Sequence, residues 1–583
     1  MTLRASVLAA LAGPASAALQ CRPNGPVVPR PTALSDSPTV AAALSGLTDA
    51  LQKAVSGDID AGFPVENSSF SLGIVSTSQE DPGVPLWEFH HLSPRNENGT
   101  GDLARDSLYL IGSVTKVFSD LVLLKSGVDP DTPAREYLPE LGGERINWDE
   151  ITLRDLGNHQ AGVPTNEPGF AEYYYLKDVF RALGFPPIED SEYPSCGVIS
   201  LNEGCSEEDL FEILVNEYPV APPSRTPVYS TLSFNIFALA LQNATSKNYS
   251  ELIDEHVVAP LGLRNTGPSP GNDDVAVIPA GESSWGADYG MGTPTSGGGL
   301  YSSLSDLSTF LHALLSKSPS VLPTPTAINK WLKPNSATGG LRSLVGTPWE
   351  IFRTETLTPE HPHVVDVYAK SGGAYGYRAQ MSALDEYGLG IIVLTAGDST
   401  ALTPLYDAVL GTIVPAVDKA AREQAAKYTG TFTADSGGVP VVAEIEQDED
   451  SLLLASLTRN GSDIVAGILE IFNQGLGTVV GLTVSEPRLF PAEVEERTTT
   501  QDGREVIRED WRMRWGDAQQ ATGGELPGKG ATRGDCLLWT VTDWLHYGRE
   551  PLDRFVFVRD AGTGEVLGLE APFLRAGLLT PGE

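Results

Sequence analysis

The residue pattern changes near position 415, and this change is the strongest constraint on the fold. Between residues 105 and 415, helix-like and strand-like stretches alternate with long loops rich in proline and glycine. Beyond a charged, helix-like stretch, the chain carries short β-like runs separated by turn residues, which is typical of an antiparallel β domain. A chain of 583 residues is also too long for one compact domain. We therefore expect two folded parts of different class.

The start of the chain has the composition of a targeting segment. Arg4, a short apolar stretch and Ala15-Ser16-Ala17 together are typical of a cleaved secretory signal. The apolar part is about ten residues long, far short of the roughly 20 that cross a membrane, and we expect no membrane span elsewhere. The predicted divisions are a signal peptide at 1–17, a proline-rich strap at 18–37, a first folded domain at 38–415, a linker or helix at 416–427 and a C-terminal β domain at 428–583.

Local patterns predict several individual elements. Apolar side chains at helical spacing predict an amphipathic helix over 38–54. Two apolar runs at 377–384 and 389–396, joined by a turn-forming cluster, predict a β-hairpin. Further strands are expected at 70–77, 84–92, 428–434, 439–447, 451–458, 478–484 and 554–560.

The charge balance narrows the classes of partner. The chain has 39 Lys and Arg against 76 Asp and Glu, a formal net charge of -37. Such a surface repels phosphate backbones and anionic lipids, so we expect neither nucleic acid nor a membrane surface as a partner. We also expect no metal, because the histidine pairs lack a third ligand at matching spacing. We interpret all four as surface residues: His90, His91, His361 and His363.

Four cysteines and several sequons suit a secreted chain. Cys196 and Cys205 flank a short loop and could form a local disulfide, which would leave Cys21 and Cys536 to pair. Four cysteines allow three pairings, and the sequence does not decide among them. Several N-x-S/T sequons are expected to carry glycans. They begin at Asn67, Asn98, Asn243, Asn248 and Asn460.

The strongest local signal for catalysis is Ser113-Val114-Thr115-Lys116, which opens an apolar helix-like run ending at Gly127. The three-residue spacing places Ser113 and Lys116 on one helix face, where a desolvated lysine can activate a nucleophilic serine. The helix start also offers free N–H groups and positive potential. A serine in this position is otherwise a helix cap.

A second candidate is Lys370-Ser371-Gly372-Gly373, on the strand that leads into the predicted hairpin. Small residues there would let a substrate backbone approach the strand edge. The Gly373 N–H could then stabilise a developing oxyanion together with the Ser113 N–H, and such a donor is typically worth about 10²–10³-fold in rate. The alternative is a glycine-rich turn with a solvated lysine.

A third candidate is Tyr229, which precedes an apolar helix-like run together with Ser230 and Thr231. A tyrosine hydroxyl near two ammonium groups would have a lowered pKa and could act as a general base. The alternative is a tyrosine that only packs against its neighbours.

In this order, the three motifs resemble the serine β-lactamase and penicillin-binding-protein superfamily. The class C and esterase-type branch is most similar, in the form of secreted fungal hydrolases with an added C-terminal β domain. Residues 151–164 are similar to the family's LLTHTSGLP segment, with His159 and Gly162 in matching places, and 296–315 to its GGLYSTADDLARF segment. The resemblance spans roughly 40–415. It implies an α/β (α+β) fold in which helices flank an antiparallel sheet beside a helical region.

The resemblance also implies a role for each motif residue. Ser113 would be the acyl-forming nucleophile and Lys116 the amine that helps to deprotonate it. Tyr229 would be the partner base or acid. Lys370 would anchor Tyr229 and the substrate carboxylate.

Two positions depart from the family pattern. Ser371 replaces the usual threonine and keeps its hydroxyl. Thr231 stands where the family has an asparagine that contacts the β-lactam side chain and helps to hold the lysine, which puts efficient β-lactam hydrolysis in doubt. The substrate and oxyanion side of the site would comprise Thr231, Ser371, Gly372 and Gly373.

A competing serine motif is less convincing. The sequence from Gly267 to Gly271 matches the G-x-S-x-G nucleophile elbow, which needs a strand before the serine and a helix after it. Prolines on both sides of Ser269 favour a loop instead.

The expected function is a secreted serine hydrolase that needs no cofactor. It would form an acyl-enzyme on Ser113 and act as an esterase or amidase on a small molecule or short peptide. β-Lactamase and acyltransferase activities are alternatives within the family. An inactive member that binds a ligand or partner is the alternative of another class, although the three motifs keep their proton-active side chains.

Overall fold

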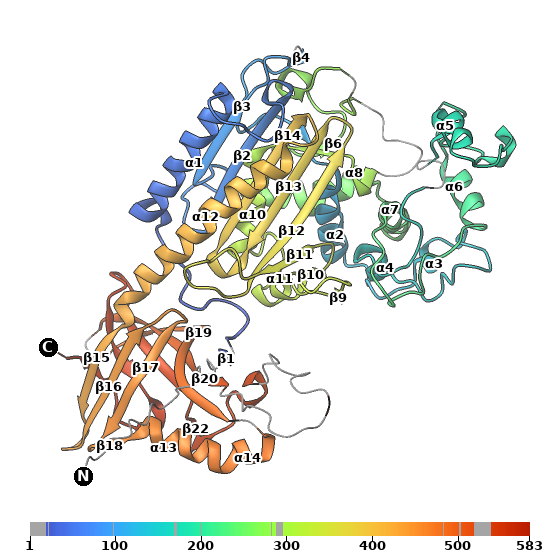
Figure 1. The fold of residues 1–583 in the computed structure, drawn as a ribbon. Coiled ribbons are helices and arrows are strands. Elements are labelled where there is room, and N and C mark those ends of the chain that lie inside the picture. Colours follow the sequence, from blue (N-terminus) through green and yellow to red (C-terminus); the bar gives the residue numbers. More distant parts are fainter. Residues whose placement is uncertain are drawn as a thin grey trace, which may run out of the picture. The chain divides into compact units, whose positions relative to one another are not determined.

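The computed structural model describes residues 19–20, 22–96, 98–167, 172–198, 200–281, 283–286, 295–481, 483–500, 503–517, 527 and 538–582. The chain forms two compact units (Figure 1). The larger comprises residues 31–420, and the smaller comprises residues up to 30 together with 421–583. The predicted signal peptide at 1–17 lies outside the described residues. No helix among the described residues is long and apolar enough to cross a membrane.

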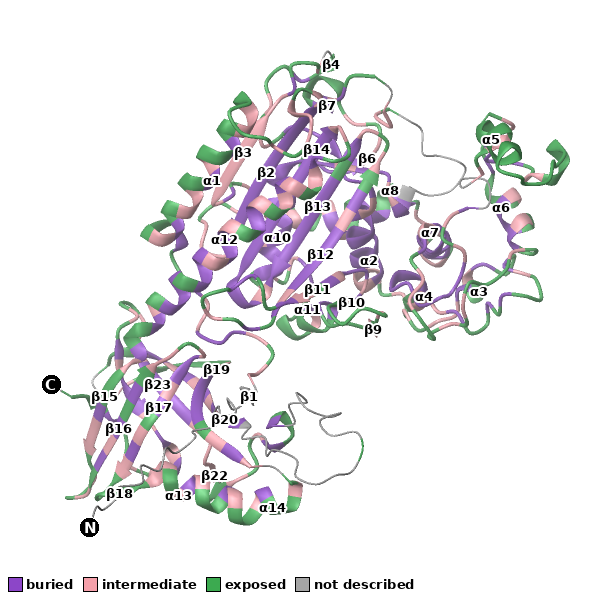
Figure 2. Ribbon diagram, viewed as in Figure 1, coloured by how far each residue is buried: buried purple, intermediate pink, exposed green. Residues whose placement is uncertain are grey.

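An eight-stranded antiparallel sheet forms the centre of the larger unit, in the order β3-β2-β14-β13-β12-β11-β10-β9. β2, β13 and β14 are buried along most of their length (Figure 2), because helices cover both faces of the sheet. The strands are β2 Ser68–Ser76, β3 Trp87–His91, β9 Ser336–Ala337, β10 Ser343–Val345, β11 Glu350–Thr354, β12 Val365–Ala374, β13 Tyr377–Leu384 and β14 Leu389–Gly397.

The two faces of this sheet pack against different helices. On one face, α1 (Pro38–Ser56) and α12 (Leu402–Ala425) share a core with alternate residues of β2 and β14. On the other, α2 (Thr115–Ser126) and α10 (Leu304–Leu315) pack in the main core. α1 begins where Ser37 caps the Val40 N–H and ends at Gly57 in the left-handed region. The predicted helix at 38–54 is therefore confirmed.

The hairpin predicted from the apolar runs is also confirmed. β13 and β14 pair in register from Leu384↔Leu389 to Tyr377↔Ala396. A 3-10 turn at Asp385–Tyr387 joins them, and Gly388 follows it with φ 60°. This left-handed conformation favours glycine, which completes the turn.

A mainly helical region lies beside the sheet and completes the larger unit (Figure 1). α7 is buried without interruption from Leu232 to Leu241, which explains the apolar run that follows Tyr229. The helices here and near the sheet edge are α3 Ala134–Tyr137, α4 Leu153–Gly157, α5 Lys177–Ala182, α6 Glu207–Leu214, α7 Thr231–Thr245, α8 Tyr249–Ile253, α9 Ala259–Leu261 and α11 Pro325–Trp331. Short strands are β4 Asn98–Gly99, β5 Tyr109–Leu110, β6 Gly267–Pro268, β7 Val277–Ile278 and β8 Leu300–Ser302.

The smaller unit is built on a ten-stranded antiparallel sheet, in the order β24-β23-β20-β19-β17-β16-β15-β25, with β1 paired to β20 and β18 to β17. Mutual backbone hydrogen bonds between Leu569 and Leu579 join β24 to the residue before β25, so the sheet closes almost into a barrel. Its strands are β1 Leu19–Gln20, β15 Gly430–Asp435, β16 Pro440–Gln447, β17 Leu452–Arg459, β18 Ser462–Asp463, β19 Val484–Thr499, β20 Glu505–Asp517, β23 Arg554–Asp560, β24 Val566–Glu570 and β25 Thr580–Pro581; β21 His546–Tyr547 and β22 Glu550–Pro551 form a separate ribbon.

One predicted strand of this unit is wrong. Residues 478–480 are the end of helix α14 (Gly477–Val480), and only Val484 belongs to a strand, as the first residue of β19. α14 continues α13 (Ile464–Ile471) through a π-helical turn at Phe472–Leu476. Asp463 caps the first helix, and Ile468 and Phe472, one turn apart, bury one face. A short apolar run has no periodicity of its own to separate strand from helix.

Candidate active site

Ser113 lies in a 3-10 turn (Gly112–Val114) that runs directly into α2. Gly112 has φ 50°, and a Cβ there would lie 2.4 Å from the Gly373 nitrogen. A Cβ at Gly372 would likewise lie 2.0 Å from the Ile111 carbonyl oxygen. Only glycine permits so close an approach. The two glycines therefore allow β12 to pass directly beside the serine.

Lys116 is wholly buried on α2, and its Nζ lies 3.0 Å from the Ser113 Oγ. The amine also donates to the Gly297 carbonyl oxygen and lies 3.4 Å from the Thr231 Oγ1. Burial lowers the pKa of Lys116 well below its ordinary value, and the neighbouring Lys370 acts in the same direction. A lowered pKa makes the neutral amine accessible, and a neutral amine can accept the serine proton.

Tyr229 lies just before α7, which begins after the capping residue Ser230. Its ring is flanked by both motif lysines, since the Nζ atoms of Lys116 and Lys370 each lie 5.1 Å from the ring centroid. The side chain is 38% exposed, so substrate can reach it. The three sequence motifs, far apart along the chain, are thus brought together around Ser113.

His159 packs against the ring of Tyr229. Its ring centroid lies 4.4 Å from that of Tyr229, and its Nδ1 accepts the Ser230 N–H at 3.2 Å. Burial lowers the pKa of His159 well below its ordinary value, and the two lysines add to this effect. A neutral imidazole with an accepting Nδ1 can pack against the tyrosine without adding a third positive charge.

Lys370 is held by a residue that the sequence motifs did not indicate. Its ammonium donates to the Glu350 Oε1, and the Ser371 N–H donates to the Glu350 Oε2 at 2.9 Å. Glu350 is on β11, opposite Ala369 of β12. The contact between Glu350 and Lys370 depends on how β11 and β12 pair on either side of the loop 355–364. No sequence pattern indicated this register.

A second pair missed by the sequence lies beside Lys116. Asn235, one turn after Thr231 on α7, donates from its Nδ2 to the Glu167 Oε1. Both side chains are buried, and burial raises the pKa of Glu167 while Lys116 opposes the rise. A Cβ at Gly297 would lie 3.6 Å from the Asn235 Oδ1. The pair therefore packs beside Gly297, whose carbonyl oxygen accepts a hydrogen bond from the Lys116 Nζ.

Asp120 is a buried acid on α2, one turn beyond Lys116. Neither carboxylate oxygen has a hydrogen-bond partner among the described residues. A Cβ at Gly157 of α4 would lie 2.3 Å from its Oδ1. Burial raises the pKa of Asp120 well above its ordinary value, although Lys116 opposes this. Burial thus favours the neutral acid on the helix that carries Lys116.

The other histidines give one correction. His363 is buried rather than on the surface, and its Nε2 lies 3.1 Å from the Tyr387 Oη and 3.4 Å from the Glu386 Oε1. The loop between β11 and β12 folds inward there, and the polar neighbours satisfy the ring. His90, His91 and His361 are partly exposed. Among the residues that the structure describes, no group of three His, Cys, Asp or Glu side chains could hold a metal ion.

The competing serine at 269 lacks an elbow. β6 covers only Gly267–Pro268, and the Ser269 N–H donates to the Gly299 carbonyl oxygen at 2.9 Å. The next element is a 3-10 turn at Asp273–Val275, not a helix that starts at the serine.

One predicted disulfide is present, between Cys196 and Cys205. Cys21 and Cys536 lie outside the described residues. Asn98, Asn243, Asn248 and Asn460 are exposed, as expected for glycan acceptors, and Asn67 is partly exposed. Their glycosylation stays a prediction.

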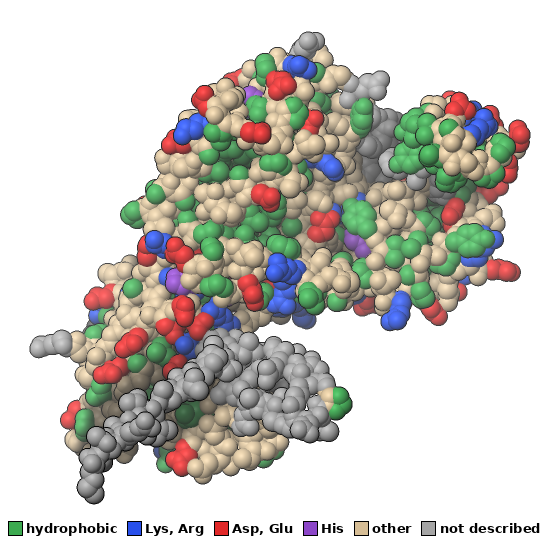
Figure 3. Space-filling view, viewed as in Figure 1, with side chains coloured by type: hydrophobic (Ala, Val, Ile, Leu, Met, Phe, Trp, Pro, Cys, Tyr) green, Lys and Arg blue, Asp and Glu red, His purple; other side chains and the backbone are tan. Residues whose placement is uncertain are grey.

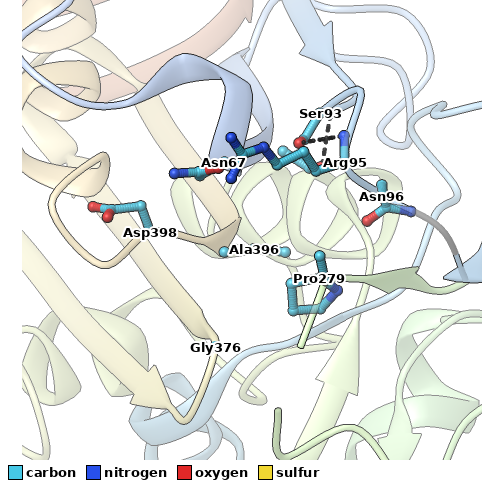
Figure 4. A pocket seen from close by; sticks show the side chains of 11 residues that line it. Asn67, Ser93, Arg95, Asn96, Pro279, Gly376, Ala396 and Asp398 are labelled. Carbon is cyan, nitrogen blue, oxygen red and sulfur yellow. Dashed lines mark hydrogen bonds between the residues drawn. The ribbon is translucent and has the colours of Figure 1, made fainter. Parts of the chain in front are cut away.

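A separate cavity of about 260 Å³ opens at the end of the central sheet where β2 begins and β14 ends (Figure 4). Asn67, Arg95, Gly376 and Asp398 are among its lining residues, and none of the four motif side chains lines it. It is therefore distinct from the site around Ser113.

Comparison with known proteins identifies the family of this chain. Residues 75–412 match the family model described as Beta-lactamase, and residues 420–581 match a model described as Beta-lactamase-like-like, C-terminal domain. The chain belongs to the β-lactamase family. The fold expected from the resemblance is confirmed: helices flank an antiparallel sheet, and a C-terminal antiparallel β domain follows.

Relatives include several named hydrolases. A β-lactamase-like protein of Arthroderma benhamiae is 46% identical over 578 residues, which cover 96% of each chain. Probable hydrolase clz13 of Cochliobolus lunatus is 25% identical and covers 86% of this chain and 84% of its own. The D-alanyl-D-alanine-carboxypeptidase/endopeptidase AmpH of Escherichia coli is 23% identical over 52% of this chain and 75% of its own. This family is thus one of β-lactamase-like hydrolases.

Among solved structures, a β-lactamase/D-alanine carboxypeptidase from Yersinia pestis is 20% identical. The match covers 63% of this chain and 99% of that one, with a TM-score of 0.45.

Proposed function

We propose that this protein is a serine hydrolase that forms an acyl-enzyme on Ser113 and cleaves esters or amides of small molecules or short peptides. The observation that carries the proposal is the 3.0 Å approach of the buried Lys116 Nζ to the Ser113 Oγ, with the pKa of the lysine lowered by burial. A buried lysine that served only packing would have no reason to lie against a hydroxyl at an accessible helix start.

In the first half-reaction, the Ser113 Oγ attacks the substrate carbonyl carbon while its proton passes to the Lys116 Nζ. The negative charge on the former carbonyl oxygen is stabilised by the N–H groups of Ser113 and Gly373, which the glycine contacts bring together. The tetrahedral species then collapses, the bond to the leaving alcohol or amine breaks, and Tyr229 supplies the proton to that group. The acyl group is now bonded to Ser113.

In the second half-reaction, water attacks the acyl carbon, and its proton passes to the Tyr229 oxygen. The bond to Ser113 breaks, the acid leaves, and the serine recovers its proton from Lys116. Lys370, which donates to Glu350 and lies 5.1 Å from the centroid of the tyrosine ring, stabilises the negative charge that develops on the Tyr229 oxygen. Each cycle consumes one water and returns every protein group to its starting state.

Thr231 supports ester or amide substrates over β-lactams. Its hydroxyl is shorter than the amide of the family's asparagine, and the Gly297 carbonyl oxygen takes over part of the task of holding Lys116. The proton-transfer machinery is thereby kept while the amide that would contact a β-lactam side chain is lost.

We also propose that the protein is secreted, through the signal at 1–17, and glycosylated. The disulfide between Cys196 and Cys205 suits an oxidising compartment. Expression in a eukaryotic secretory host should release protein that begins after Ala17 and loses mass on glycosidase treatment. Retention inside the cell with residues 1–17 still attached would contradict this.

The test of the catalytic proposal is labelling with a fluorophosphonate probe, followed by intact mass and peptide mapping. We expect one adduct on Ser113 that is lost in Ser113→Ala and kept in Ser269→Ala, the matched control for the competing serine. Hydrolysis of a dissolved p-nitrophenyl ester should follow the same pattern, with slower turnover of nitrocefin. Rapid nitrocefin turnover would favour a β-lactamase. No adduct in folded protein would favour a family member that only binds a ligand.

A further inference from the structure

Residues 172–193, here called the aromatic lobe, expose nearly all of their apolar side chains. The structure describes every one of these residues, and none of them is buried. Leu183 is 72% exposed and Phe185 57%. Figure 3 shows hydrophobic side chains gathered over α5, the helix of this lobe. Contiguous exposed apolar surface of this kind marks an interaction site in a soluble protein.

The aromatic lobe is ordered by contacts among its own residues. The rings of Phe180 and Phe185 meet edge to face at 5.3 Å, and those of Tyr174 and Tyr193 at 5.1 Å. The Lys177 ammonium donates to the Tyr174 hydroxyl at 2.7 Å. The disulfide between Cys196 and Cys205 follows directly. These contacts hold a shape without burying the lobe, so its exposed side chains serve something other than the core.

The lobe is part of a long excursion of the chain, residues 165–230, whose two ends lie together at the candidate active site. The Ser230 hydroxyl donates to the Pro164 carbonyl oxygen at 2.6 Å, and the Thr231 N–H donates to the Thr165 carbonyl oxygen at 2.7 Å. The two ends of the excursion are thus joined beside Tyr229. A ligand that covers the lobe is held on the same excursion that carries this catalytic tyrosine.

The part of the excursion that leads back from the lobe to Tyr229 also exposes apolar side chains. Tyr218 is 68% exposed and Val220 59%, and the Val220 N–H donates to the Gly162 carbonyl oxygen at 2.8 Å. Exposed apolar side chains therefore occur on the segment that leads back to Tyr229 as well as on the lobe.

The negative charge of the lobe distinguishes between the partners that could cover it. Residues 172–193 carry five Asp and Glu against two Lys and Arg, on a chain of net charge -37. An anionic membrane would be repelled, because helices that bind such membranes carry a lysine- and arginine-rich face. In a symmetric dimer through the lobe, the acidic residues of the two copies would face each other. An uncharged lipid surface would not repel the acidic residues of the lobe, and tyrosine rings are suited to the boundary between such lipid and water.

We propose that the aromatic lobe docks onto aggregates of uncharged, lipophilic esters and presents them to Ser113. The proposal rests on the proposed acyl-enzyme function and names its substrate class. The ester leaves the aggregate, its acyl group passes to the serine with release of the alcohol, and water then releases the acid.

The kinetic test follows hydrolysis of tributyrin as its concentration rises through its solubility limit. We expect the rate to rise at least fivefold when the emulsion forms. The double variant Leu183→Ser/Phe185→Ser and the single variant Val179→Ser should lower the ratio of the emulsion rate to the dissolved rate, the double variant by at least fivefold. Val479→Ser, an 80% exposed apolar residue of the smaller unit, is the matched control and should keep the ratio. A ratio unchanged in both lobe variants would overturn the proposal.

The binding test uses Ser113→Ala, which turns over no substrate, in flotation with a triolein emulsion and with phosphatidylserine vesicles. We expect flotation with triolein, its loss in the double lobe variant, and none with the vesicles. Binding to vesicles alone, or a dimer that the lobe variants dissociate, would overturn the proposal. Tributyrin hydrolysis without flotation would refute docking and leave the hydrolase standing. Flotation without Ser113 acylation would refute the hydrolase and leave docking standing.

Discussion

The start of α2 and the middle of β12 each hold a wholly buried lysine, and their surroundings differ. Lys116 contacts two hydroxyls and a carbonyl oxygen. Lys370 contacts the carboxylate of Glu350. A carboxylate favours the charged ammonium, whereas burial among neutral groups favours the free amine. Burial alone therefore does not define the role of a lysine here. The different partners support the proposed roles, with Lys116 in proton transfer and Lys370 in charge stabilisation.

The largest expected effect comes from removing the base. Lys116→Met should lower kcat/KM on a dissolved ester by about 10³–10⁴-fold, because the serine loses the group that takes its proton. Lys116→Arg should be as inactive, since a guanidinium stays protonated. The measurement is steady-state hydrolysis of a p-nitrophenyl ester. A loss of less than tenfold would assign the base to another group.

Stability gives the control for this variant. The folded-state pKa of Lys116 is lowered, so the protonated amine opposes folding at low pH, and this penalty disappears as the pH rises toward the unfolded value of about 10.4. Lys116→Met should therefore be more stable than the parent at pH 6, with a smaller difference at pH 9. Urea unfolding at the two pH values measures it. Lower stability at both would mean that the loss of activity reflects misfolding.

The next effect concerns the acid side of the pH–rate profile. The rate should fall about tenfold per pH unit once Lys116 is protonated. Lys370 lowers the pKa of Lys116 and Glu350 raises it. Lys370→Met should therefore move this limb to higher pH and Glu350→Gln to lower pH. Profiles of kcat/KM between pH 5 and 10 would reveal opposite shifts. Shifts in the same direction would break the division of roles between the two lysines.

Much of the site could be predicted because its signals are local. Ser113 lies in the 3-10 turn that leads into α2 and Lys116 in the first turn of that helix, and the hairpin 377–396 has both apolar runs and its turn in adjacent sequence. The residues alone also singled out Lys370 and Tyr229 as candidates, and the resemblance to a known family then implied a role for each. These features need no knowledge of how distant segments meet.

The missed features depend on contacts between distant segments. Glu350 reaches Lys370 only through the register of β11 against β12, and Glu167 reaches Asn235 across an excursion of more than sixty residues. β19 was missed because its second half is charged and exposed. His363 is buried because a polar loop folds inward. In each case tertiary packing decided what the local pattern left open.

A smaller effect is expected when the lysine on β12 loses its partner. Glu350→Gln keeps the shape but removes the charge beside the buried ammonium, and kcat/KM should fall about tenfold at the pH optimum. Glu350→Asp should recover part of the loss, because it restores a carboxylate on a shorter side chain. Steady-state kinetics at the optimum of each variant measure both. A Glu350→Gln enzyme with parental kcat/KM would show that Lys370 does not need a carboxylate partner.

The smallest effect on activity is expected at Asp120, the acid that lies nearest to Lys116 on its helix without forming the pair that Glu350 forms with Lys370. Asp120→Asn should change kcat/KM by less than about threefold, because burial raises the pKa of this side chain well above its ordinary value and so favours the neutral form, which the amide resembles. Stability should respond instead. Above about pH 4 the unfolded protein releases the Asp120 proton, whereas the folded protein keeps it up to its raised pKa. Between these two pKa values the free energy of unfolding of the parent falls by about 1.4 kcal/mol per pH unit, and Asp120→Asn does not show this fall.

Asp306 is the matched control, because it is buried but accepts hydrogen bonds from Thr266 and from the backbone N–H groups of Arg264 and Asn265. Asp306→Asn should destabilise the protein at neutral pH by about 1–3 kcal/mol, since an amide cannot accept all of these donors. Urea unfolding at pH 5 and 7 separates the two sites. If Asp120→Asn destabilised the protein like Asp306→Asn and also shifted the pH–rate limb to lower pH, Asp120 would be charged. Lys116 would then sit in a carboxylate environment like that of Lys370, and the difference between the two lysines would have to come from the hydroxyl of Ser113 alone.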